Sequence, residues 1–489
     1  MVALLFISVL VVAIASAETQ AAYSIGQSWA PFIAFTCIAW LIAYGTAAWL
    51  YFGNPYLFSM AYIVALAVFH LGVLVPYALG MIDVQDWTAG PGRWFKLAGW
   101  YTALAFGLFG IGFAATCLRN CRRRSTSGQY DDDAVADWNI ARLRNLAVGL
   151  AIAAILGLFI ATLKLGNLLA YTRFDLFFRA SDPRFLSLFF YMGPTAALAL
   201  VVTARTPKQR LASYSFGACI LIIVLLSGNR SWAFFPLLAG AVLWAKLGRR
   251  IPLTVSAGII AGVLLVIPVI AMLRSMGTYE HLSLRDLEAS QEQSSITGAL
   301  REMGASLGTL AVTLQYIPRE EPYRFGRQYL LYLRQAIPNI GLSASKEYSR
   351  DTIYQRIRSN PRYVLELDPA DWASWKLIPD SFLAGAGTGY SAIAEAYFSF
   401  GYVGVAVWFI GLGWFLARMD LTDMRTHYRW LIFATFFFWS LPVTARNTFG
   451  VFTKPAALIL SVMAIWVLVR RFTPLRRPPA PRRAQTSIR

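Results

Sequence analysis

Three charged residues, Arg230, Glu395 and Arg446, are the strongest candidates for chemistry in the sequence, because each adjoins long apolar segments. An ionisable group close to membrane hydrocarbon must be paired, hydrated or used in function. The three come from separate parts of the chain, yet they are expected at similar depth on one side of a membrane. We therefore predict that they converge on one polar site.

The surroundings of each residue also leave an alternative. Arg230 lies in LLSGNRSWAFFP, a turn between two apolar segments that are each shorter than the roughly 20 residues needed to cross a bilayer. Such a hairpin can sink below the headgroups, or its arginine can extend to the surface. Arg446 lies in a polar break, LPVTARNTFGVFTKP, and its alternative is an interfacial anchor. Glu395 precedes an apolar helix by about one turn, where a lone carboxylate is costly without arginine or water.

Aromatic and basic residues interleave in the run YRFGRQYLLYLR at 323–334. Aromatic rings stack on sugar faces, and guanidinium groups bind phosphate or carboxylate through paired hydrogen bonds. The run therefore suits an acidic glycan or a lipid-linked phosphate. An amphipathic helix resting on a bilayer also pairs aromatic residues with arginine, and this alternative stays open.

The composition sets the environment in which these residues must work. The 489 residues are 57% hydrophobic and 14% charged, against roughly 25% charged residues in soluble domains. Long apolar runs exclude a soluble enzyme and predict an all-α polytopic membrane protein. About twelve membrane-spanning helices are expected, at residues 2–17, 30–51, 56–79, 98–117, 145–163, 186–203, 211–227, 232–245, 252–273, 400–417, 430–445 and 455–469. Residues 1–17 could instead be a cleaved signal peptide, although they lack a basic n-region.

The distribution of Lys and Arg predicts the orientation. With both termini in the cytoplasm, the cytoplasmic loops and tail hold 22 of the 44 basic residues, which agrees with the positive-inside rule. The expected organisation is nine transmembrane helices in 1–273, a mostly helical periplasmic loop domain in 274–399, three more transmembrane helices in 400–470, and a basic disordered cytoplasmic tail in 471–489. Within the loop domain, 284–316 and 325–337 show helical spacing and end near proline.

No cofactor or metal is expected from the sequence. The three histidines fall in a span, an outer loop and an inner loop, and the four cysteines include no second pair that could complete a zinc site. The net charge of +19 is largely explained by the cytoplasmic segments, so it does not indicate a nucleic-acid partner.

The chain resembles the Wzy-type oligosaccharide repeat-unit polymerases, which make O-antigen and exopolysaccharide. The stretch GAGTGYSAIAEAYFSFGYVGVAVWFIGLGWFLAR is similar to that family's region after its large periplasmic loop. LLSGNRSWAFFPLL resembles the family's Gly/Ser-Arg helical hairpin, and YRFGRQYLLYLRQAIPNIGLS resembles a segment of its loop. The similarity covers roughly residues 140–470.

The resemblance implies a membrane-embedded, metal-independent glycosyltransferase of the bacterial inner membrane, which polymerises undecaprenyl-pyrophosphate-linked repeat units at the periplasmic face. Arg230 and Arg446 would bind pyrophosphate, and Glu395 would act as base or orient the acceptor. The candidates for substrate binding are Arg274, Arg327, Arg334, Tyr329 and Ser391. Membrane lipids and the lipid-linked oligosaccharide are the expected partners, and a chain-length regulator is a candidate partner.

Two other functions compete with this hypothesis. An O-antigen ligase shares the layout but is expected to use a loop histidine with arginine, and the outer His281 lies outside a matching motif. A lipid-linked oligosaccharide flippase or another transporter usually carries ionisable residues deep in several spans and an internal repeat, and neither is visible.

Overall fold

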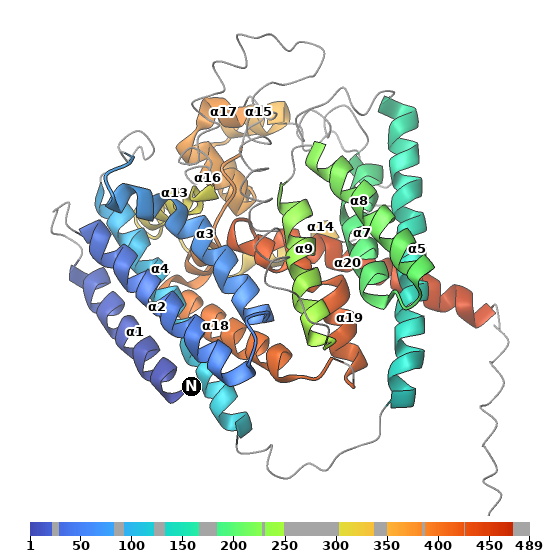
Figure 1. Ribbon diagram of the computed structural model, residues 1–489. Coiled ribbons are helices and arrows are strands. Elements are labelled where there is room, and N and C mark those ends of the chain that lie inside the picture. Colours follow the sequence, from blue (N-terminus) through green and yellow to red (C-terminus); the bar gives the residue numbers. More distant parts are fainter. Residues whose placement is uncertain are drawn as a thin grey trace, which may run out of the picture.

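The computed structural model describes residues 1–21, 29–82, 92–121, 133–165, 183–226, 230–248, 303–336, 350–383, 387–424 and 426–472. Every regular element in these residues is a helix, which confirms the all-α class (Figure 1). Seven of the described helices are long and apolar enough to cross a membrane: α1 (Val2–Ala21), α2 (Trp29–Phe52), α3 (Phe58–Ala78), α4 (Gly92–Cys121), α5 (Asp133–Leu165), α8 (Pro207–Leu226) and α18 (Ala392–Leu421).

Three more helices contain a shorter apolar stretch: α7 (Pro183–Thr203), α9 (Arg230–Lys246) and α20 (Gly450–Phe472). Together these helices coincide with all the expected spans but two. The span expected at 252–273 lies outside the described residues. The count of twelve spans, the domain bounds and the cytoplasmic placement of both termini stay predictions.

The continuous helix expected at 430–445 is wrong. The chain forms α19 (Tyr428–Phe436), followed by two 3-10 turns, η6 (Phe438–Ser440) and η7 (Pro442–Ala445). Pro442 has no N–H to donate to the carbonyl of Phe438, which accepts instead from the amide of Leu441 at 2.9 Å. The break carries the chain to Arg446 in an irregular conformation.

The segment between α9 and α18 supplies helices at one end of the spanning bundle. They are α13 (Ser306–Tyr316), α14 (Arg327–Ala336), α15 (Arg350–Ser359), the 3-10 helix Pro361–Glu366, α16 (Pro369–Leu377) and α17 (Pro379–Leu383). Figure 1 shows α15, α16 and α17 close together near the top of the view, above α3, α4 and α18. α13 packs on α3, α4 and α18, and α14 packs on α20. The helix expected at 325–337 is confirmed by α14.

Small residues bring α4 and α18 into close contact. A side chain added at Gly112 would collide with the carbonyl oxygen of Ile410, and one added at Gly413 would collide with that of Phe109. Glycine at helix interfaces lets backbones approach closely in membranes, where packing rather than water drives association. α4 and α3 are the most enclosed of the candidate spans, with 83% and 78% of their apolar windows buried.

Helix α18 is kinked near its start. Phe400 and Gly401 have non-helical backbone angles, and Gly401 has φ +60°, a conformation that only glycine adopts at little cost. The kink leaves the carbonyls of Phe398 and Ser399 without their helical donors. The amides of Arg324 and Phe325 donate to these two carbonyls, each at 3.0 Å. The kink therefore attaches the segment before α14 to the first part of α18.

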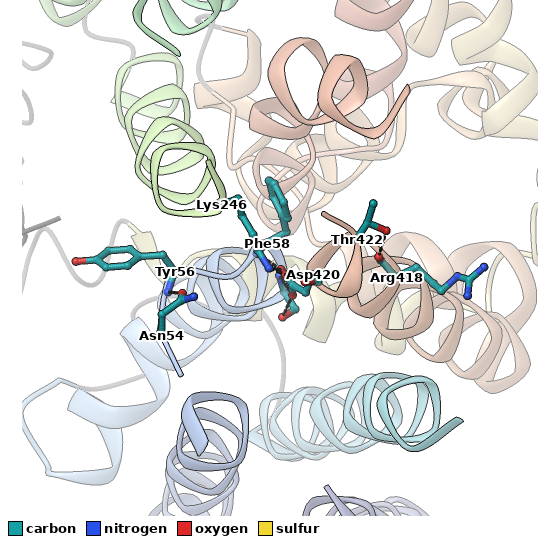
Figure 2. A network of polar contacts seen from close by, with 8 residues as sticks. Asn54, Tyr56, Phe58, Lys246, Arg418, Asp420 and Thr422 are labelled. Atoms are coloured by element: carbon teal, nitrogen blue, oxygen red, sulfur yellow. Dashed lines mark hydrogen bonds and ion pairs between the residues drawn. The ribbon is translucent and has the colours of Figure 1, made fainter. Parts of the chain in front are cut away.

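Helices α3 and α18 run antiparallel and are joined at both ends. At the end of α18, the Asp420 carboxylate accepts hydrogen bonds from the amides of Phe58 and Ser59, which begin α3, at 2.8 and 3.1 Å. Lys246, the last residue of α9, lies 3.6 Å from the same carboxylate (Figure 2). At the start of α18, Ser391 bonds to His70 of α3. The two connections fix the register of α3 against α18.

Candidate functional site

The sequence predicted that Glu395 would precede a helix beginning at residue 400. The helix α18 begins earlier, at Ala392, and Glu395 lies in its first turn. Its side chain is 3% exposed. The oxygen Oε2 accepts a hydrogen bond from the amide of Phe449 at 2.7 Å, whereas Oε1 is buried and has no hydrogen-bond partner among the described residues. The free oxygen gives this acid an acceptor that a ligand or water can use.

Tyr332 of α14 is the neighbour of Glu395 from the preceding segment. It is fully buried, and its hydroxyl group makes no hydrogen bond of ordinary geometry in the described part of the chain, although Thr448 and Glu395 are its polar neighbours. Burial raises the pKa of the Tyr332 phenol well above its ordinary value, and the charge of Glu395 raises it further. Its ring packs against Gly450, where an added side-chain carbon would lie 3.0 Å from Cδ1. Tyr332 is thus a neutral donor held beside a carboxylate.

A buried guanidinium group lies on the same side of α18. Arg324 is 8% exposed, and its carbon Cζ lies 4.4 Å from the centre of the Phe398 ring. Nη1 donates to the carbonyl of Leu367 at 2.6 Å, while Nε and Nη2 are buried without a hydrogen-bond partner in the described ranges. The side chain therefore keeps two donors available.

Asp368 begins α16 near Arg324. Its carboxylate accepts from the amide of Ala370 at 2.9 Å, the usual capping bond for an aspartate at this position. Burial raises the pKa of Asp368, and the charges of Lys454 and Arg324 oppose that effect. The region around Glu395 therefore holds charges of both signs.

Ser391 caps α18 and bonds to a histidine inside the membrane-spanning bundle. Its Oγ accepts from the amides of Ile393 and Ala394 at 3.2 and 3.3 Å. The same atom lies 2.8 Å from Nε2 of His70, and both side chains are fully buried. The hydroxyl group is thus occupied by the protein itself, and its predicted role in substrate binding stays a prediction.

Arg446 lies at the turn that follows the two 3-10 helices. Its carbonyl accepts from the amide of Tyr390 at 2.6 Å, immediately before Ser391. Its guanidinium carbon lies 5.6 Å from the centre of the Phe69 ring. Because Phe449 donates to Glu395, the short turn 446–449 connects the arginine and the acid. The structure therefore places the backbone of Arg446 next to the first turns of α18, which carry Glu395.

The other predicted residues are only partly described. α9 begins at Arg230, but the side chain of Arg230 lies outside what the structure describes, as does that of Arg334 in α14. The ring centre of Phe235 in α9 lies 6.1 Å from the ring centre of Phe69, so the second turn of α9 adjoins the ring that also faces Arg446. Arg274 falls wholly outside the described residues.

The remaining two predicted residues lie on α14. Arg327, the first residue of the helix, is exposed. The ring of Tyr329 lies 6.0 Å from that of Phe449 and 6.1 Å from that of Tyr332. Tyr329 therefore adjoins the Glu395 region.

Sequence reasoning did not select His70, Arg324, Tyr332 or Asp368. A histidine inside an otherwise apolar span is a signal of function, because ionisable groups are costly there. Arg324 and Tyr332 stood in the interleaved aromatic and basic run, but nothing local marked which of its residues would be buried. Among the described residues, no group of His, Cys, Asp and Glu is placed to hold a metal ion.

A family model described as O-antigen polysaccharide polymerase Wzy matches residues 1–475 of the chain. No curated protein and no solved structure matches it.

Proposed function

The chain belongs to the O-antigen polysaccharide polymerase Wzy family, and from this premise we propose that it joins undecaprenyl-pyrophosphate-linked oligosaccharide units at the periplasmic face of the bacterial inner membrane. Membership of the family makes it an inner-membrane polymerase of repeat units. The identity of the lipid carrier, the side of the membrane and the residue roles belong to the proposal.

In the proposed reaction, the growing glycan is transferred from its carrier to the incoming unit. The bond between its anomeric carbon and the pyrophosphate oxygen breaks, and a hydroxyl oxygen of the incoming sugar forms a new bond to that carbon. The hydroxyl proton passes to a base, and the polyprenyl pyrophosphate leaves with the bonding electron pair. The site must therefore accept one proton and stabilise developing negative charge on phosphate.

Glu395 carries the proposal as the proton acceptor. The observation that supports it is the buried oxygen Oε1, which makes no hydrogen bond of ordinary geometry in the described structure although Oε2 is held by Phe449, and the Tyr332 phenol is a polar neighbour of this carboxylate. A carboxylate fixed at one oxygen and open at the other can take a proton in a defined direction. The hydroxyl of Tyr332 is a donor that can orient the acceptor sugar beside it.

Arg446 is proposed to bind the departing pyrophosphate. Its backbone is anchored to Tyr390, and its turn also supplies the amide that holds Glu395. A cation positioned where charge develops lowers the barrier, because it needs no reorganisation during the reaction. Arg230 is proposed to act with it, since Phe235, in the second turn of α9, lies against the same Phe69 ring.

Complementation of cells that lack the gene tests the proposed roles. Glu395→Gln keeps the shape of the side chain but cannot accept the proton, and loss of a general base typically costs about 100- to 10,000-fold in rate. We expect single repeats to remain on the carrier and long polymer to disappear. Arg446→Gln should produce the same product pattern, because losing one preorganised donor costs roughly 100- to 1,000-fold.

Glu320→Gln and Arg358→Gln are the matched controls, because both residues are exposed in the same segment of the chain. With protein levels equalised, both controls should give normal chain length. Full polymerisation by Glu395→Gln would refute the assignment of the base. Long polymer that accumulates on the carrier in the deletion cells would indicate a ligase instead, and repeats trapped on the cytoplasmic side would indicate a flippase.

A further inference from the structure

The hydrogen bonds of His70 define its protonation. Its Nδ1 lies 2.9 Å from the carbonyl oxygen of Leu66, which can only accept, so Nδ1 carries a proton. The oxygen of Ser391 already accepts from two backbone amides, which occupy both of its lone pairs. The hydroxyl proton is therefore what Ser391 offers to His70, and Nε2 is the acceptor at 2.8 Å. His70 is neutral in this arrangement.

This bond connects the start of α18 to a rigid part of the bundle. Helix α3 is among the most enclosed spans, and His70 is fully buried within it. Ser391 is the capping residue of α18, and its carbonyl accepts from the amide of Glu395 at 2.9 Å. The direction in which the first turn leaves the cap therefore determines where the carboxylate of Glu395 lies.

The same part of α3 also contacts the arginine of the site. Phe69, next to His70, lies under the guanidinium group of Arg446, and the amide of Tyr390 bonds to the Arg446 carbonyl. Two successive residues of α3 therefore contact the site: Phe69 contacts Arg446, and His70 bonds to Ser391 at the start of α18.

We propose that His70 is a positioning residue for glycan transfer: by accepting the hydroxyl proton of Ser391, it orients the first turn of α18 so that Oε1 of Glu395 faces the acceptor. The inference rests on the proposed function. His70 is not expected to touch the substrate, because its two ring nitrogens are both occupied by the protein. His70 acts on the rate of the chemical step, since displacing a catalytic group by about 1 Å can lower that rate about 100-fold.

The test measures kcat and KM with purified protein in nanodiscs, using lipid-linked single repeats extracted from cells that lack the gene. His70→Leu removes the acceptor and should lower kcat about 10- to 100-fold, with KM within about twofold of wild type. His70→Gln should restore kcat to within about fivefold of wild type, because its amide oxygen can accept the Ser391 proton. Ser391→Ala should match His70→Leu, and the double variant should be no slower than either single variant.

Asp420→Asn is the control for a purely structural connection. Asp420 joins α3 to α18 at the opposite end from the site, so weakening it should lower stability and leave kcat unchanged. If His70→Leu does not fold, Ser391→Ala carries the test with the same expected loss. The positioning role is overturned if the variant tested keeps kcat within twofold, if His70→Gln is as slow as His70→Leu, or if Asp420→Asn is equally slow.

The wild-type protein separates this inference from the proposed function. A wild-type protein that does not lengthen the extracted glycan would overturn the proposed function and the positioning role together. A wild-type protein that lengthens it, while His70→Leu is fully active, would overturn the positioning role alone.

Discussion

Replacement of Asp420 should destabilise the bundle more than any surface acid, because its carboxylate is fully enclosed and several groups depend on it. It accepts from the backbone amides of Phe58 and Ser59 and from the Ser59 hydroxyl, and it faces the ammonium group of Lys246 (Figure 2). Asp420→Ala removes all of these acceptors at once, so the first turn of α3 loses its cap.

The expected loss follows from these contacts. A buried donor left without a partner costs about 1–3 kcal/mol, and breaking one side of a buried ion pair costs about 3–5 kcal/mol. The cost of breaking the ion pair is at the lower end of its range here, because Lys246 keeps its bond to the Asp420 carbonyl at 2.6 Å and its contact with the Phe52 ring. These costs overlap, so we expect Asp420→Ala to lower the free energy of unfolding by about 4 kcal/mol. Asp420→Asn keeps one acceptor and should cost about 1–2 kcal/mol.

Equilibrium unfolding in mixed micelles with increasing SDS measures these changes. Asp423→Ala is the control, since Asp423 is exposed three positions further along the chain. A double-mutant cycle with Lys246→Met should give a coupling energy above about 0.5 kcal/mol, because the two side chains are in direct contact. The reasoning fails if Asp420→Ala costs less than 1 kcal/mol or no more than Asp423→Ala.

Three further outcomes follow from the site and its supports. Gly450→Ala should displace the Tyr332 ring and reduce polymer length in cells at equal protein level. Gly411→Ala should not, because no atom of the described residues lies within 4 Å of its added carbon. Gly401→Ala should lower the free energy of unfolding by about 1–3 kcal/mol in SDS titrations, because a side chain is strained at φ +60° and ψ −144° and its added carbon would lie 2.9 Å from the Tyr323 hydroxyl oxygen. An unchanged free energy of unfolding would contradict this strain. Burial raises the pKa of Asp368, so the contribution of Asp368 to the free energy of unfolding falls as pH rises from about 4 through its higher pKa in the folded protein. Asp368→Asn should therefore make the free energy of unfolding depend less on pH in this range. An unchanged pH dependence would contradict this reasoning.

The apolar runs were sufficient to predict most of the helices, because hydropathy over a window reports directly on membrane insertion. They failed at 430–445, where apolar character continues but the missing N–H of Pro442 interrupts the helix. Glu395 could be selected from the sequence, since an isolated acid beside an apolar helix is costly anywhere in that position. His70 could not be assigned a role, because its partner, Ser391, is 321 residues away.

The kink at Gly401 explains why the surroundings of Glu395 come from the segment before α18. Residues 402–421 rise about 30 Å as a helix, which is enough to cross the hydrocarbon core by themselves. The turns before the kink are therefore not needed for crossing and can carry an acid. Because the kink also exposes two carbonyls, it binds the backbone at Arg324 and Phe325, and α14 follows directly with Tyr332. The position of the groups around Glu395 thus depends on a glycine that lies outside the site.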